Sequence, residues 1–251
     1  MVMSILSGFP DPLLQDIIED RCIPIIGAGF SKNAILPPGK EMPDWKTLGK
    51  YFAQLGGYDG EDPLDAISNF THTFKRPKTI GILKKILHID NADVKPGSAH
   101  LSFARLPFTT VITTNFDYLL ERAYEQVGKP YETIIEESQL AIDSITDYKT
   151  TKILKIHGDF SNPKRLIITE EDYDTFRNEY PIISTHVSNL LITKTPLFIG
   201  YSLNDPDFRG LWETIRSRLG NNTRQAYALV SSSTITVTTR FHRRGVEVIP
   251  I

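Results

Sequence analysis

Four short groups of residues in this sequence have the types and spacing that could do chemistry. They are Gly27-Ala-Gly-Phe-Ser31, Thr114-Asn-Phe-Asp117, His157-Gly-Asp159 and Gly200-Tyr-Ser-Leu-Asn-Asp205. An asparagine amide can orient a water molecule or a hydroxyl, because it carries both donors and an acceptor. A histidine with an ordinary pKa of ~6.5 can accept a proton. A loop with closely spaced glycines can hold an anion.

The first group follows an apolar run, residues 23–26, that is typical of a buried strand. Its two glycines let the backbone turn sharply and approach a ligand. A helix that begins at Phe30 or Ser31 would aim its free N–H groups at the same place, which favours an anion such as a pyrophosphate. Lys32 occupies the place of the third glycine in the common dinucleotide-binding pattern, so a turn without a ligand remains an alternative.

The elements that must position these groups follow from the apolar pattern. Apolar and β-branched runs predict strands at residues 23–26, 108–113, 151–156, 166–169, 196–200, 226–230 and 246–251. Helical spacing predicts helices at 12–20, 116–126, 170–178, 182–192, 207–219 and 234–244. Short strands that alternate with helices indicate a doubly wound, Rossmann-like α/β fold with a parallel sheet.

A second region of the chain is purely helical. Helical patterns at 45–55, 63–74, 79–87 and 98–106 have no strand-like neighbour. We therefore expect a helical insert, about 40–106, between the first and second strands of a single domain that covers residues 1–251. The chain stops on the predicted strand 246–251 with no helix after it to cover the sheet, which favours a piece of a longer polypeptide.

The four groups follow predicted strands, and doubly wound folds bind ligands beyond the carboxyl ends of their strands. This placement predicts one shared site. Each group also has a purely structural interpretation. Asn115 could cap a helix that begins at Phe116, and Asp117 could favour the dipole of that helix. His157 could be a hydrogen-bonded core residue, and Asn204-Asp205 could form a turn before the next helix.

Composition excludes several classes of protein. The 251 residues include 28 basic and 30 acidic side chains, a net charge of −2, so no general nucleic-acid or membrane surface is indicated. No apolar run approaches the roughly 20 residues that span a bilayer, and the N-terminus does not resemble a secretory signal. The single cysteine, Cys22, excludes an internal disulfide. We expect a cytoplasmic protein.

The four groups, in this order, resemble those of sirtuin-like domains, and most closely the bacterial sirtuin-like domains of anti-phage defence proteins that hydrolyse NAD. The resemblance runs from about residue 20 to residue 251. Sirtuins that deacylate lysine carry a zinc module held by four cysteines, and this chain has one cysteine. The resemblance therefore implies cleavage of NAD, as a substrate, without a metal.

The resemblance also implies roles for particular residues. The glycine loop would hold the NAD phosphates, and Gly200 and Ser202 would line the adenosine side. Asn115 and Asp117 would lie by the nicotinamide and its ribose, with Asn115 as the positioning group and His157 as the base. The implied NAD contacts are Gly27, Ala28, Gly29, Phe30, Ser31, Thr114, Asp117, Gly200, Ser202, Asn204 and Asp205.

The function so predicted is an NAD glycohydrolase that yields nicotinamide and ADP-ribose, as a toxic effector of anti-phage defence. The resemblance further implies a homo-oligomer with a motor ATPase or a sensor domain as a partner. One alternative is a module that binds NAD or ADP-ribose without turnover, although such a module needs neither Asn115 nor His157. Another is a nuclease subunit, which the balanced charge and scattered acids do not favour.

Overall fold

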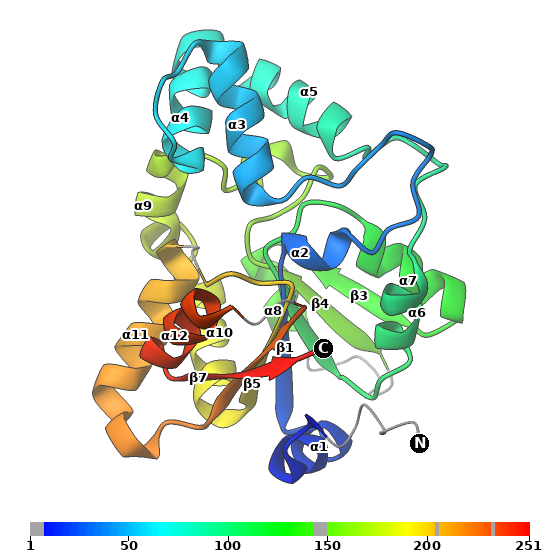
Figure 1. Ribbon diagram of the computed structural model, residues 1–251, viewed down its shortest axis with the longest axis vertical. Helices are drawn as coiled ribbons and strands as arrows, with labels where there is room; N and C mark the ends of the chain where they lie inside the picture. Colours follow the sequence, from blue (N-terminus) through cyan, green and yellow to red (C-terminus); the bar gives the residue numbers. More distant parts are fainter. Residues whose placement is uncertain (1–7, 143–149, 204–205, 232–233) are drawn as a thin grey trace.

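The computed structural model describes residues 8–142, 150–203, 206–231 and 234–251 (Figure 1). Seven parallel strands form one sheet in the order β3-β4-β2-β1-β5-β6-β7. The strands are β1 (Cys22–Ile26), β2 (Thr110–Thr113), β3 (Tyr131–Ile134), β4 (Thr151–Lys155), β5 (Thr195–Ile199), β6 (Ala226–Val230) and β7 (Val246–Pro250). The predicted doubly wound α/β fold is confirmed.

Helices cover both faces of the sheet. Alternate residues of β1 point to opposite faces, so Ile23 and Ile25 pack in one core cluster and Cys22 and Ile26 in the other. One face is covered by α6 (Ser98–Ala104) and α7 (Leu119–Val127), and α1 (Asp11–Ile18) also packs there. The other face is covered by α9 (Glu170–Glu179), α10 (Pro181–Thr193), α11 (Pro206–Leu219) and α12 (Ile235–Arg243). Burial on both faces explains why β1 is continuously apolar.

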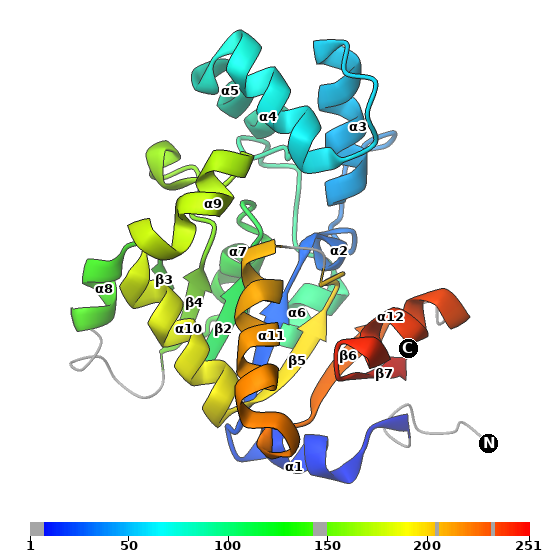
Figure 2. The ribbon, with the colours of Figure 1, turned by 90° about the vertical axis from the view of Figure 1, so that its left-hand side faces the viewer.

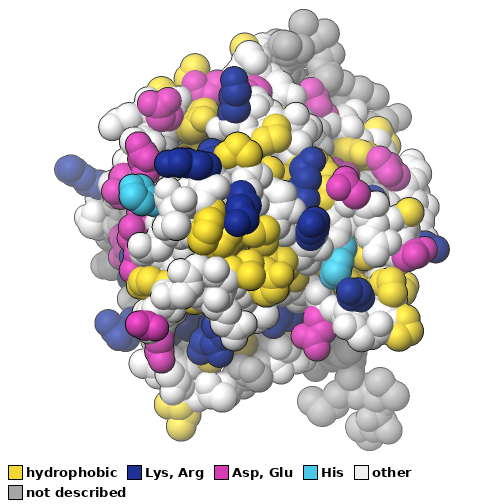
Figure 3. Space-filling view, turned by 90° about the horizontal axis from the view of Figure 1, so that it is seen from above, with side chains coloured by type: hydrophobic (Ala, Val, Ile, Leu, Met, Phe, Trp, Pro, Cys, Tyr) yellow, Lys and Arg dark blue, Asp and Glu magenta, His cyan; other side chains and the backbone are white. Residues whose placement is uncertain are grey.

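The helical insert lies above the carboxyl ends of the strands (Figures 1 and 2). It contains α3 (Trp45–Gly56), α4 (Pro63–Phe74) and α5 (Arg76–Ile86), which pack around Phe52, Ile67 and Phe70. The short α2 (Ala28–Ser31) precedes these helices and α6 follows them, so α2–α6 all lie between β1 and β2. Seen from above, apolar side chains gather near the middle of this face, with Lys and Arg among them (Figure 3).

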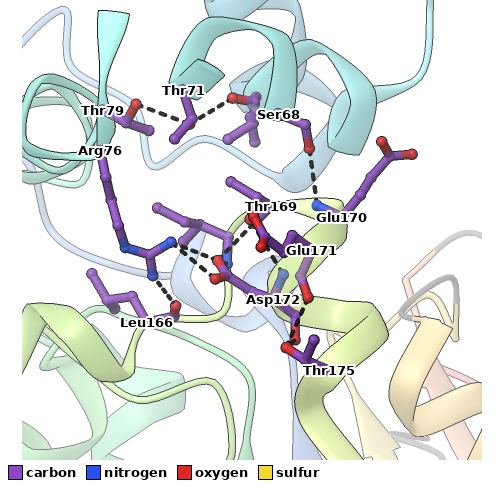
Figure 4. Close-up of polar contacts among 12 residues, drawn as sticks. Ser68, Thr71, Arg76, Thr79, Leu166, Thr169, Glu170, Glu171, Asp172 and Thr175 are labelled. Carbon is purple, nitrogen blue, oxygen red and sulfur yellow. Dashed lines mark hydrogen bonds and ion pairs between the residues drawn. The ribbon is translucent and has the colours of Figure 1, made fainter.

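Polar contacts fasten the insert to α9 (Figure 4). Arg76 of α5 donates two hydrogen bonds, of 3.0 and 2.8 Å, to the carboxylate of Asp172, and it also contacts the carbonyl of Leu166. Ser68 of α4 accepts the backbone N–H of Glu170 at 2.9 Å. One terminal nitrogen of the guanidinium makes both bonds to Asp172 and the other reaches Leu166, so Arg76 is tied to two points of the segment that leads into α9. The insert and the first turn of α9 are therefore held as one unit.

The structure differs from the sequence predictions in several elements. Residues 166–169 form no strand, although the N–H of Ile167 donates to the carbonyl of His157 at 3.0 Å. Strand β3 and helix α8 (Glu137–Ile142) were missed, because β3 is short and half-exposed at the sheet edge, so its polar residues hide the apolar pattern. The helix predicted from Phe116 begins at Leu119.

Two further features complete the fold. Cys22 is buried at the start of β1, where burial raises the pKa of its thiol to about 12. A thiol with so high a pKa is inert, because the thiolate is the reactive form. Within the described ranges, we find no helix with the length and apolar character that crossing a bilayer requires.

Candidate functional site

Two backbones cross closely where β1 and β5 end, which is the point where the strand order switches sides. The N–H of Gly27 donates to the carbonyl of Ile199 at 3.0 Å, and that of Gly29 donates to Gly200 at 2.8 Å. A Cβ on Gly27 or Gly29 would lie 2.7 or 2.8 Å from the carbonyl oxygen of Gly200. Glycine is thus required here first by the approach of one backbone to another.

The helix after this crossing begins at Ala28, before the predicted start at Phe30 or Ser31, and it is only one turn long. The N–H groups of Gly29 and Phe30 donate within the protein, to the carbonyls of Gly200 and Gly27. The expected helix start with free N–H groups was therefore wrong. Contact of this loop with the phosphates of NAD stays a prediction.

A chain of hydrogen bonds links the glycine crossing to the end of β2. The Asn115 amide nitrogen donates to the carbonyl of Gly27 at 3.1 Å and to the Ser31 hydroxyl at 2.9 Å. The Ser31 hydroxyl donates to a carboxylate oxygen of Asp117 at 2.7 Å. These three side chains are all buried, between 2% and 9% exposed. Three of the predicted site residues therefore form one connected group, and Thr114 lies beside them at the end of β2.

Asn115 does not act as a side-chain cap for α7, whose N-cap residue is Tyr118 without a side-chain hydrogen bond. The carboxylate of Asp117 instead accepts the N–H of Leu119 at 3.1 Å, in the first turn of that helix. The structure therefore does not support Asn115 as a helix cap, but it supports the interpretation that Asp117 stabilises the start of this helix. The Asn115 amide is directed at the glycine crossing.

His157 lies just beyond β4 with its ring among aromatic side chains. Its ring centroid is 5.2 Å from that of Tyr173 and 6.4 Å from those of Phe116 and Phe176. The residue is 2% exposed. Strand β4 pairs with β2, so His157 and Asn115 follow neighbouring strands at the one edge of the sheet where the sequence analysis placed them. The ring is therefore enclosed by side chains of the loop after β2 and of α9.

A buried ion cluster lies beneath these two loops. The Lys155 ammonium donates to the carbonyl of Asp117 and to the Glu121 carboxylate, both at 2.7 Å, and lies 3.5 Å from the Asp159 carboxylate. Burial raises the pKa of Glu121, and the charge of Lys155 opposes that shift. The sequence analysis missed this cluster, although a lysine inside an apolar strand was a visible signal.

The segment after β5 carries the last predicted group. Gly200 adopts a left-handed φ of +60°, Tyr201 is buried and Ser202 is exposed. Arg244 donates to the carbonyl of Leu203 at 2.6 Å, a contact that sequence reasoning also missed. Asn204 and Asp205 lie outside the described residues.

A cavity of about 450 Å³ lies apart from the predicted NAD contacts. It is lined by Tyr118, Glu121, Arg122, Glu125, Tyr131, Thr133, Ile135, Gln139, Asp159 and Ser161. It touches the candidate site only through the ion cluster of Lys155. Within the described ranges, no group of three or more His, Cys, Asp or Glu residues could hold a metal ion.

His100 of α6 packs under the glycine loop, with its ring 4.6 Å from that of Phe30. Its Nδ1 accepts the N–H of Gly97 at 3.3 Å, and burial lowers the pKa of the imidazole. Below about pH 6.5, His100 binds a proton in the unfolded chain but stays neutral in the folded chain until a lower pH. The free energy of unfolding therefore decreases as the pH falls. The expected loss is at most ~1.4 kcal/mol per pH unit.

Unfolding by denaturant at pH 7.5 and 5.5 measures this effect. The His100→Asn variant keeps an acceptor for Gly97 but does not titrate. The wild-type protein should lose more free energy of unfolding than the variant between the two pH values. Equal losses in both proteins would show that His100 does not keep a lowered pKa in the folded state.

Fold and site together define a class: a doubly wound α/β protein whose switch point carries a glycine crossing, with Asn115 and His157 at neighbouring strand ends. Within that class, residues 109–249 match the model of the SIR2-like domain family. The chain belongs to this family. The resemblance to sirtuin-like domains is thus confirmed.

Characterised relatives are distant. The chain is 28% identical over 214 residues to the NAD(+) hydrolase ThsA of Cytobacillus dafuensis, covering 85% of this chain and 42% of that protein. The NAD(+) hydrolase ThsA of Acinetobacter baumannii is 28% identical over 221 residues, 87% and 44% of the two chains. Defense-associated sirtuin 2 of Bacillus subtilis is 29% identical over 201 residues, which cover 76% of this chain and 19% of that protein. The chain spans less than half the length of these relatives.

Proposed function

We propose that this chain is the catalytic domain of an NAD glycohydrolase, which cleaves NAD to nicotinamide and ADP-ribose. The observation that carries the proposal is the connected group at the ends of β1 and β2, beside His157 at the end of β4. Two similar proteins are named NAD(+) hydrolases, which supports it.

The chemistry suits these residues. Nicotinamide leaves the ribose of NAD as a neutral molecule, so the leaving group needs no general acid. The ribose passes through an oxocarbenium-like state, and a water molecule must be aimed at its anomeric carbon. The Asn115 amide would position that water or the ribose hydroxyls. His157 would accept the proton of the water as it attacks.

The glycine crossing and the segment after β5 would hold the rest of the substrate. The pyrophosphate would lie beside Gly27, Gly29 and Gly200, beyond the carboxyl ends of β1 and β5 at the switch point. Ser202 is exposed beside them and would face the adenosine part. Their identity as NAD contacts rests on this placement and on the family.

The biological setting is part of the same proposal. We propose a toxic effector of anti-phage defence in the cytoplasm, and the name of one similar protein, a defense-associated sirtuin, supports the role in defence. Uncontrolled loss of NAD would kill the host, so the activity must be gated. Burial of His157 and Asn115 fits a gated site. We propose a single domain over residues 1–251 that works as a homo-oligomer, with a motor ATPase or a sensor domain as partner.

The test is chromatography of NAD after incubation with the purified protein. Nicotinamide and ADP-ribose in equal amounts are the expected products. Binding of NAD in a calorimeter without products would instead support a binding module without turnover. If the protein neither binds NAD nor forms products, the proposal is contradicted. DNA cleavage that requires a metal ion would favour a nuclease.

A further inference from the structure

The two residues proposed to act on the substrate lie on separate loops. Asn115 follows β2 and His157 follows β4, and the ladder between these strands ends at the pair Thr113 and Lys155. One further backbone hydrogen bond, from Ile156 to Thr113 at 3.1 Å, continues it. Beyond that point, side chains link the two loops, and Phe116 of the first loop packs against His157 and Phe160 of the second.

Lys155 spans this gap. Its ammonium donates at 2.7 Å to the carbonyl of Asp117, in the loop of Asn115. It lies 3.5 Å from the carboxylate of Asp159, in the loop of His157. Its third partner, Glu121 at 2.7 Å, belongs to α7. The ammonium donates two hydrogen bonds, and the Asp159 carboxylate is its third charged or polar neighbour.

Stability alone is a poor explanation for this arrangement. The Lys155 side chain is 1% exposed, and removing an ammonium from water costs more than a single ion pair regains. The cluster also holds two carboxylates for one ammonium. Buried ionic groups of this kind can instead specify one geometry, and here the geometry specified is that of two loops.

We propose that Lys155 is a positioning residue of the site, which fixes the loop of Asn115 relative to the loop of His157. As a role in NAD hydrolysis, this inference rests on the proposed function. Lys155 does not touch the substrate. It keeps the amide and the imidazole at the separation that an aimed water molecule requires, and a misplacement of about 1 Å can cost about a hundredfold in rate.

Asp159→Asn is the first variant to test. It weakens the tie to the His157 loop and leaves Lys155 and Glu121 as a balanced pair, so the protein should fold. We expect kcat to fall about tenfold and KM to change less than about threefold, because the glycine crossing is untouched. An unchanged kcat would overturn the proposal.

Lys155→Met separates positioning from stability. This variant leaves two buried carboxylates without a cation, so both Tm and kcat should fall. Adding Glu121→Gln removes one of those charges and should restore part of the Tm but not the kcat. Recovery of kcat together with Tm would show a merely structural role. Lys194→Met is the matched control, since it breaks a 3.0 Å ion pair with Asp20 at the opposite end of the sheet and should leave kcat unchanged.

Hydrogen exchange tests the inference without using activity. In Asp159→Asn and in Lys155→Met/Glu121→Gln, the backbone amides of both loops, residues 114–117 and 157–160, should exchange faster than in the wild-type protein. Faster exchange in one loop only, or in neither, would overturn the proposal. If the wild-type protein releases no nicotinamide, the proposed function fails, and this measurement still decides whether Lys155 couples the loops.

Discussion

Replacing His157 with alanine is expected to lower nicotinamide release by at least about a hundredfold, the contribution typical of a general base. The ring is 2% exposed and packed between Phe116, Tyr173 and Phe176, so its removal also leaves a cavity. That cavity should lower the free energy of unfolding by about 2 kcal/mol. Loss of activity in this variant alone would not separate catalysis from packing.

His157→Phe is the matched control, because phenylalanine fills the aromatic surroundings and carries no base. We expect this variant to unfold at nearly the wild-type temperature, to bind NAD, and to release nicotinamide as slowly as His157→Ala. Chromatography of the products and calorimetric NAD binding are the measurements. Wild-type turnover in His157→Phe would show that His157 is a core histidine and that another group is the base.

Gly200→Ala is expected to be the most destabilising single substitution at the glycine crossing. A Cβ there would lie 2.1 Å from the nitrogen of Phe30 and 2.7 Å from the carbonyl carbon of Gly29, both backbone atoms. The φ of +60° adds a cost of about 1 kcal/mol for any residue with a Cβ. Relief requires β1 and β5 to separate at their carboxyl ends, so the total cost should exceed about 4 kcal/mol.

Gly128→Ala provides the comparison. Gly128 also has a left-handed φ, of +70°, but a Cβ there meets no atom within 4 Å. Its substitution should therefore cost only about 1 kcal/mol, the backbone term alone. Unfolding by denaturant measures both variants. If the two lose similar free energy, the close backbone crossing does not exist in solution.

Much of the fold could be predicted from local pattern. Strands β1 and β5 are continuously apolar because helices cover both faces, and the glycine and polar groups that follow strands mark the carboxyl edge. The edge strand β3 was missed because its half-exposed residues carry no apolar run. Residues 166–169 are apolar for another reason, since Leu166, Ile167 and Ile168 fill the cores beneath the insert and α9.

The site was predictable in its members but not in its contacts. Sequence order placed Asn115, Asp117 and Ser31 near one another, whereas their hydrogen-bond chain depends on how α2 lies against β2. Gly27 and Gly29 were expected to let a ligand approach the backbone. In the structure they let the backbone of Gly200 approach instead. Lys155 could not be placed, because its partners come from segments 34 to 38 residues away and from the next loop.

The state of Cys22 makes the chain suitable for site-selective labelling. It is the only cysteine in the sequence, and its thiol is buried with a pKa of about 12. A maleimide reagent at neutral pH would therefore leave it unmodified. A new thiol at the exposed Lys85 of α5 would be the single reactive position, with the native cysteine kept in place. A change in the signal of a dye attached there, as nucleotide is added, would show whether the insert moves.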